Sequence, residues 1–139
     1  MNPTLVIDYA NTGDVPFLAG NDRHVSQDLM DQKVGRREVL IARLDEAAVG
    51  FLRFNYFWDI IPIMNLLFVL APYRRRGIGR NMVTFWEGQM NRCGHRRVLT
   101  STQSNEQAQH FYRKLGYADI GGFVLPGEPL EIILYKSLA

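Results

Sequence analysis

The chain has 139 residues, of which 47% are apolar and 22% are charged, and its formal net charge is +2. These values fit a single globular domain over residues 1–139 and exclude a disordered tail, while the small net charge gives no indication of nucleic-acid binding. No apolar run is long enough to cross a membrane, and the first residues lack a signal-peptide pattern. Cys93 is the only cysteine, so an internal disulfide is excluded and a cytoplasmic location is expected.

The N-terminal part of the chain predicts one strand followed by helix. Residues 4–9 are rich in β-branched side chains, which favour a strand. The turn-like residues 12–14 offer helix caps, and a helical region follows to about Lys33. Its apolar spacing is irregular, so we expect a break near Gly20 and Asn21.

The middle of the chain predicts a hairpin and a buried strand. Residues 38–44 and 49–58 have strand character and flank a turn at 45–47. Residues 60–70 are nearly all apolar, which is typical of a strand covered on both faces.

The C-terminal half predicts two helices that alternate with strands. Apolar residues recur at helical spacing over 78–91, and Gly94 stands where a helix C-terminal glycine belongs. After a strand at 97–102, residues 104–107 fit a capping box that opens a helix ending at Gly116. Two final strands are predicted at 117–125 and 130–138, and the whole order indicates a mixed α/β sheet covered by helices.

The segment between the strand at 60–70 and the helix at 78–91 carries the clearest functional signal. The first amides of a helix have no internal partner and, with the helix dipole, favour phosphate oxygens. Gly77 and Gly79 let the backbone approach a ligand closely because neither carries a Cβ. Positive charge around the same loop comes from Arg74, Arg75, Arg76 and Arg80.

Other phosphate-binding loops fit this segment less well. The P-loop pattern is absent, and Met82 stands where the dinucleotide fingerprint needs its third glycine. Taken alone, a Gly-x-Gly beside arginines also describes an ordinary turn next to solvated charge.

Two motifs together resemble the GNAT superfamily of N-acetyltransferases. The first is Arg74-x-x-Gly77-x-Gly79 after Val69-x-x-Pro72, and the second is Asn105-x-x-Ala108-x-x-Phe111-Tyr112-x-x-Leu115-Gly116-Tyr117. The motifs cover about a sixth of the chain, and the order of predicted elements agrees with the family along nearly all of it.

The resemblance implies a GNAT-type α/β fold, with a mixed, mostly antiparallel central sheet, helices on both faces and one splayed parallel strand pair. That pair would be 63–70 and 97–102, with a bulge in the first strand, and the pantetheine arm of acetyl-CoA would pair with the freed backbone. By the same resemblance, the cofactor-binding residues are Phe68, Val69, Arg74, Arg75, Arg76, Gly77, Ile78, Gly79, Arg80 and Asn105.

The implied chemistry is direct attack of a primary amine on the thioester of acetyl-CoA, which serves as co-substrate. Tyr112 matches the family tyrosine that donates a proton to the leaving thiolate, and the amide of Val69 is a candidate to polarise the carbonyl. From helical spacing, Phe111 and Tyr112 cannot face the same way, so we expect one of them to belong to the core and the other to turn toward the cofactor. The general base stays open, since Asn65 replaces a glutamate of some relatives; the candidates are Glu38, Asp59 and His24.

The sequence leaves several functional alternatives. The first is an acetyltransferase for a small-molecule or protein amine, and the second is a non-catalytic CoA-binding regulatory module of the same fold. A nucleic-acid-binding domain is disfavoured because no aromatic residues interleave with Arg74–Arg76. Neither a metal nor a membrane partner is expected, since no His, Asp or Glu cluster has metal-ligand spacing. Family relatives suggest a homodimer, and the aromatic cluster at 55–59 suits an acceptor pocket, core packing or a dimer surface.

Overall fold

The computed structural model describes residues 3–138, which contain seven strands and four α-helices. The strands are β1 (Leu5–Tyr9), β2 (Val39–Leu44), β3 (Ala47–Phe57), β4 (Ile61–Val69), β5 (Arg97–Gln103), β6 (Ala118–Phe123) and β7 (Glu131–Ser137). The helices are α1 (Val15–Asn21), α2 (Gln27–Gly35), α3 (Ile78–Arg92) and α4 (Ala108–Lys114), with short 3-10 turns η1 (Thr12–Asp14) and η2 (Ala71–Tyr73).

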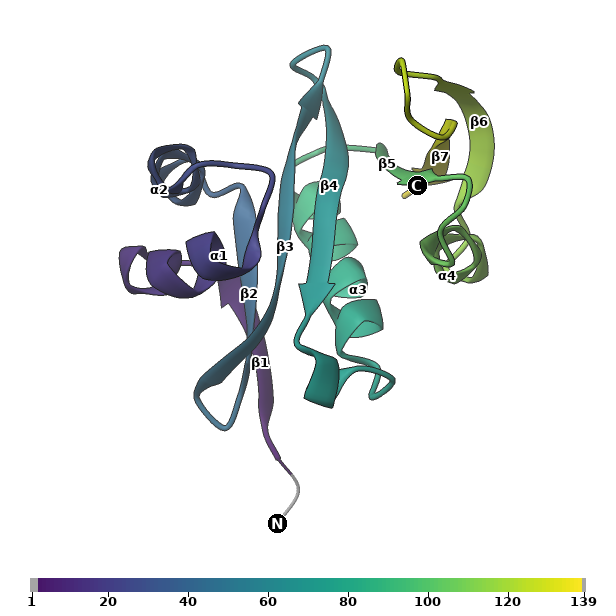
Figure 1. Ribbon diagram of the computed structural model, residues 1–139. Coiled ribbons are helices and arrows are strands. Elements are labelled where there is room, and N and C mark those ends of the chain that lie inside the picture. Colours follow the sequence, from purple (N-terminus) through teal and green to yellow (C-terminus); the bar gives the residue numbers. More distant parts are fainter. Residues whose placement is uncertain (1–2, 139) are drawn as a thin grey trace. The chain divides into compact units, whose positions relative to one another are not determined.

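The strands form one mixed sheet, in the order β1-β2-β3-β4-β5-β7-β6 (Figure 1). Strands β4 and β5 run parallel, whereas β1–β2, β2–β3, β5–β7 and β6–β7 are antiparallel. This confirms the predicted mixed, mostly antiparallel sheet with one parallel pair. None of the helices within residues 3–138 combines the length and apolar character needed to cross a membrane.

The chain divides into two compact units. The first comprises Met1–Phe54 and Leu66–Trp86, and the second comprises Asn55–Asn65 and Glu87–Ala139. Strands β3 and β4 and helix α3 each contribute residues to both units.

In the first unit, α1 and α2 cover one face of the sheet. Val39, Ile41 and Phe51 project from β2 and β3 to this face, because alternate residues of a strand point the same way. Leu18 of α1 and Met30 of α2 are fully buried against them. Burial of these large apolar side chains fixes the two short helices, which have too few residues to be stable alone.

The start of α3 covers the opposite face of the first unit. Ile78, Met82 and Trp86 are buried at a spacing of four residues, as expected for one stripe of a helix. The ring of Trp86 lies 5.8 Å from that of Phe54, which shares its face of β3 with Leu52. The first unit therefore has helices on both faces, as the sequence predicts.

The second unit is built around the ladder of β5, β7 and β6. Strand β5 pairs with β7 from Arg97–Ser137 to Gln103–Glu131, and the parallel β4–β5 register matches Ile63 with Leu99. Glu87 of α3 is half-buried in this unit. Its carboxylate accepts hydrogen bonds from Tyr117 Oη at 2.7 Å and from Lys136 Nζ at 2.9 Å. These bonds tie α3 to strand β7 and to the start of β6.

The predicted helical region after β1 is interrupted at the expected place. Helix α1 ends at Asn21, and Asp22 accepts a hydrogen bond from the amide of His24 through Oδ1, at 2.9 Å. Ser26 then caps α2 by accepting from the amide of Leu29 at 3.1 Å. The two caps divide the region into separate helices.

The predicted capping box at residues 104–107 is wrong. Helix α4 begins only at Ala108, and its N-cap residue Gln107 makes no side-chain cap. Glu106 Oε1 instead accepts a hydrogen bond from the amide of Gln103 at 2.9 Å, which stabilises a separate turn before the helix. A capping box does occur at η1. Asn11 Oδ1 accepts a hydrogen bond from the amide of Gly13, and Asp14 Oδ2 accepts one from the amide of Asn11.

Candidate active site

The loop between β4 and α3 is fixed at its start by the sheet. Leu70 N donates to Val49 O at 2.8 Å, and Tyr73 N donates to Leu70 O at 2.9 Å, which forms η2. The guanidinium of Arg74 then folds back, and its Nε donates to Val69 O at 2.8 Å. The first arginine of the sequence motif therefore holds the end of β4 to the loop.

Gly77 provides the turn from which α3 starts. Its φ angle is +82°, a conformation that L side chains rarely adopt. A Cβ at this position would meet no atom within 4 Å, so the requirement for glycine is conformational, and the space before the loop is open. Asn81 N donates to Gly77 O at 3.0 Å, which closes the first helical turn. The amides of Ile78, Gly79 and Arg80 thus occupy helix-start positions, where no intrahelical acceptor exists.

The arginines of the loop are exposed and keep their positive charge. Arg76 Cζ lies 5.6 Å from the ring centroid of Tyr73, and Arg75 adopts a left-handed φ of 63°. Within residues 3–138, none of Arg74, Arg75, Arg76 and Arg80 forms an ion pair with an acidic side chain. The helix start and this unneutralised charge together suit a ligand that carries several phosphates.

The last residues of β4 present their backbone groups to opposite sides of the strand. Phe68 O lies toward β3, where a Cβ built on Gly50 would be 2.6 Å from it. Leu70 N also points to β3, where it binds Val49 O. Because consecutive peptide groups alternate in direction, the amide of Val69 points away from β3. Phe68 instead contributes its ring, which lies 5.4 Å from that of Phe51.

Tyr112 of α4 lies in the second unit and is buried there. Its side chain is 6% exposed, and its ring packs between those of Phe111 at 5.3 Å and Tyr117 at 5.8 Å. Burial raises the pKa of Tyr112 to about 12; a hydrogen bond with Thr100 lowers it in part, and the charge of Glu106 adds to the rise. The phenol is therefore protonated throughout the neutral range and can donate one hydrogen bond through its O–H.

Thr100 is a contact of Tyr112 that the sequence does not reveal. It lies on β5, where its Oγ1 donates to Met64 O of β4 at 3.1 Å, and it is also the hydrogen-bond partner of Tyr112. It thereby links the tyrosine to the parallel β4–β5 pair. A single threonine in a strand carries no local pattern that distinguishes it from its neighbours.

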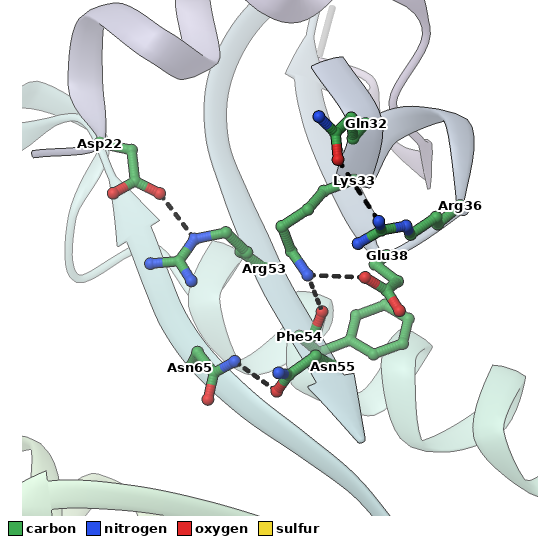
Figure 2. Close-up of polar contacts among 9 residues, drawn as sticks. All are labelled: Asp22, Gln32, Lys33, Arg36, Glu38, Arg53, Phe54, Asn55 and Asn65. Atoms are coloured by element: carbon green, nitrogen blue, oxygen red, sulfur yellow. Dashed lines mark hydrogen bonds and ion pairs between the residues drawn. The ribbon is translucent and has the colours of Figure 1, made fainter. Parts of the chain in front are cut away.

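The remaining predicted residues are placed as follows. Asn105 is exposed in the turn before α4, and His24 is exposed in the loop between α1 and α2. Asp59 is exposed at the β3–β4 turn, with a φ of 65°. Glu38 is engaged by Lys33, whose Nζ lies 2.7 Å from Glu38 Oε1 (Figure 2).

Asn65, at the position of the missing glutamate, donates through Nδ2 to Asn55 Oδ1 at 2.6 Å (Figure 2). An amide pair of this kind cannot accept a proton at neutral pH. In the part of the chain from 3 to 138, no three His, Cys, Asp or Glu residues are grouped to hold a metal ion.

Comparisons with known proteins agree with this arrangement. A model of the acetyltransferase (GNAT) family matches residues 9–117. The structure resembles Ard1 from Thermoplasma volcanium, with a TM-score of 0.82, 13% identity and coverage of 96% of this chain and 97% of that one. No match was found among curated proteins.

Two similar structures contain a CoA ligand. YncA from Salmonella typhimurium, solved with its cofactor acetyl-CoA, has a TM-score of 0.82 at 17% identity, covering 98% of this chain and 95% of that one. PaiA N-acetyltransferase from Thermoplasma acidophilum, in complex with coenzyme A, has a TM-score of 0.79 at 17% identity, covering 96% and 99%. The fold, the site and the family match define the class: the chain belongs to the acetyltransferase (GNAT) family. It is accordingly an N-acetyltransferase that depends on acetyl-CoA.

The contact between β3 and β4 generates a first prediction. In Gly50→Ala, the new Cβ would lie 2.6 Å from Phe68 O and would force the end of β4 to move. We expect a loss of stability of about 1–3 kcal/mol, and an acetyl-CoA affinity reduced about tenfold because the Val69 amide shifts. Urea unfolding and calorimetric titration measure the two effects. Gly88→Ala in α3 is the control, since its Cβ meets no atom within 4 Å and it should be neutral or stabilising. Equal acetyl-CoA affinities in Gly50→Ala and Gly88→Ala would contradict this account.

The raised pKa of Tyr112, about 12, predicts a dependence of stability on pH. An unfolded tyrosine ionises near pH 10, so the contribution of Tyr112 is complete below that pH and is lost as the pH rises through about 12. We expect this residue to remove about 1.4 kcal/mol of stability per pH unit above about 10. Tyr112→Phe should show a shallower decline of the urea midpoint between about pH 10 and 12. Parallel declines in both proteins would show that Tyr112 is not the titrating group.

Proposed function

We propose that this enzyme transfers the acetyl group of acetyl-CoA to a primary amine by direct attack of the amine on the thioester. The observation that carries the proposal is the start of α3, where Gly77 leaves open space before unpaired helix amides and unneutralised arginines. A pyrophosphate with a further ribose phosphate matches that concentration of positive charge.

The donor would be held along the end of β4 and the following loop. The amides from Arg75 to Arg80 would bind the diphosphate, and the amide of Val69 would polarise the thioester carbonyl. Val69 supports this role because its amide points away from β3. We further propose that the pantetheine arm pairs with the free edge of β4 beside Phe68 and Val69, and that Asn105 contacts the same arm.

Tyr112 is proposed to interact with the departing thiolate. An ordinary thiol has a pKa of about 8.5, whereas the pKa of Tyr112 is raised to about 12. Complete proton transfer from the phenol to the thiolate is therefore unfavourable in this environment. Because the only hydrogen of Thr100 Oγ1 is donated to Met64 O, Tyr112 is the donor in its bond with Thr100. Tyr112 would exchange that acceptor for the negative sulfur and stabilise it by a hydrogen bond as the C–S bond breaks.

The amine must lose its proton before attack, because an alkylammonium has a pKa of about 10.4. Glu38 is engaged by Lys33, and Asn65 is an amide, so neither supplies a free carboxylate. We propose that the proton leaves through water rather than directly to one side chain.

Because neither Glu38 nor Asn65 supplies a free carboxylate, an alternative is that the chain binds CoA as a regulatory module without turnover. Release of CoA in the presence of an amine distinguishes the two functions.

The acceptor is a small-molecule or protein amine, and we propose a homodimer as the working assembly. The exposed, single thiol of Cys93 suits a reducing cytoplasm, which is the proposed location.

The donor site is tested by titrating the protein with acetyl-CoA and with dephospho-CoA. We expect saturable binding of acetyl-CoA and weaker binding of the ligand without the ribose phosphate. Gly77→Glu should weaken acetyl-CoA binding at least about tenfold, since a carboxylate would occupy the open space and repel the phosphates. Gly127→Glu is the matched control, because Gly127 has a φ of +79° and a Cβ there would also meet no atom within 4 Å. If Gly77→Glu and Gly127→Glu bind acetyl-CoA equally, the loop is not the phosphate site.

The role of Tyr112 is tested with Tyr112→Phe on any amine that the enzyme acetylates. We expect kcat to fall by about 10- to 100-fold with little change in acetyl-CoA affinity, since the ring remains and only the donor is lost. Tyr117→Phe is the control; it removes the hydroxyl bound to Glu87 and should lower stability while leaving kcat within about twofold. Full activity of Tyr112→Phe would exclude the proposed hydrogen bond to the thiolate.

A further inference from the structure

A buried ion pair joins β3 to the loop after α1. Arg53 Nε donates to Asp22 Oδ2 at 2.7 Å, and the two side chains are 8% and 0% exposed. Asp22 is itself fixed, because its Oδ1 accepts from the amide of His24 at 2.9 Å and its amide donates to Leu18 O. The pair therefore holds the guanidinium in a defined orientation.

Most of the donor capacity of Arg53 is unused. A guanidinium has five N–H donors, and only the one on Nε has a hydrogen-bond partner among residues 3–138. Figure 2 shows the two Nη atoms pointing away from Asp22. The nearby Lys33 differs, since its ammonium uses two of its three donors, to Glu38 Oε1 at 2.7 Å and to Phe54 O at 2.8 Å. Within residues 3–138, Trp86 Nε1 is the one buried side-chain donor or acceptor without a partner, so the unbonded Nη atoms of Arg53 reach solvent and are accessible to a ligand.

The position of Arg53 connects it with the proposed reaction. Arg53 is two residues from Phe51 on β3, so both side chains lie on one face, about 7 Å apart along the strand. The ring of Phe51 lies 5.4 Å from that of Phe68, which immediately precedes Val69. The free Nη groups thus lie on the same sheet face as the ring of Phe68, near the end of β4 where the thioester would be held. Along β3 they are displaced from Phe51 by one same-face position.

The surrounding charge favours an anion at this point. Asp22 neutralises one positive charge, but the exposed Arg23 follows it in the same loop. With Nε already bonded, Nη1 and Nη2 remain as a planar fork, and this arrangement matches the two oxygens of a carboxylate.

We propose that Arg53 binds a carboxylate on the acceptor, so that the enzyme acetylates amines that also carry a carboxylate, such as amino acids. Asp22 is a positioning residue that orients the fork. The inference rests on the proposed acetyltransferase function and specifies its acceptor class.

The test compares amino acids with their primary amides, in which an uncharged amide replaces the carboxylate, by measuring CoA release with acetyl-CoA at a pH where the α-amine of both is largely neutral. We expect kcat/KM to favour the carboxylate form by about 10- to 100-fold, mainly through KM. Arg53→Lys keeps a positive charge beside Asp22 but loses the fork, and it should reduce this preference at least about fivefold. The double variant Asp22→Asn with Arg53→Gln leaves no unpaired charge and should abolish it. Arg43→Lys is the control, because Arg43 forms a comparable 2.7 Å pair with Asp14 and should retain the preference.

The outcomes separate this proposal from the function on which it rests. Failure to bind acetyl-CoA would overturn the proposed function. Equal rates for acids and amides, or a preference that survives both Arg53 variants, would overturn the carboxylate site. If acetyl-CoA binds but no amine reacts, the CoA-loaded protein is titrated with N-acetyl amino acids and N-acetyl amino acid amides. Selective binding of the acids, lost in Arg53→Lys, supports the proposal, and binding of neither series overturns it.

Discussion

The close approach of β3 to the end of β4 is the contact on which the proposed donor site depends. Gly50 has no Cβ, and only for that reason can Phe68 O lie where a side chain would otherwise be. This contact, with the Leu70–Val49 hydrogen bond, directs the peptide groups of Phe68 and Leu70 toward β3 and leaves that of Val69 facing away. Arg74 then closes the loop on Val69 O, and α3 starts four residues later. A side chain at Gly50 would therefore displace the end of β4, and with it the amides of the following loop that are proposed to contact acetyl-CoA.

Buried ion pairs attach the N-terminal helices to the sheet of the first unit. Asp14 binds Arg43, Asp22 binds Arg53, and Lys33 binds Glu38, each at 2.7 Å. Asp14 and Asp22 flank α1, and Lys33 lies in α2. Their partners Arg43 and Arg53 lie in β2 and β3, and Glu38 directly precedes β2. Such pairs contribute little net stability compared with apolar packing, but an unpaired member would be costly, so they specify one arrangement of the helices. Among them, Arg53 combines burial with unused donors, and that combination suits recognition rather than simple attachment.

Burial makes the phenol of Tyr112 less acidic. Packing among aromatic rings removes its hydroxyl from water and raises its pKa to about 12, which makes it a weak acid but a permanent donor. A donor of this kind is well suited to stabilise a thiolate, which needs a hydrogen bond during C–S cleavage and is protonated only weakly afterward. The link through Thr100 to Met64 O places this donor on the strand pair that runs parallel.

The sequence by itself determined the elements, their order and the family, because each depends on residues close together in the chain. Helical spacing at Ile78, Met82 and Trp86 and the motif around Gly77 are local patterns, and the structure agrees with them. Only the tertiary structure decided which distant groups meet. Gly50 with Phe68, Thr100 with Tyr112, and Arg53 with Asp22 depend on strand register and helix placement, which no local pattern encodes. The incorrect capping box has the same cause: Ser104 and Gln107 have the right spacing, but Glu106 binds the amide of Gln103, and Ser104 N donates to Leu130 O across the sheet. Local spacing permits several hydrogen-bond partners, and the folded chain selects among them.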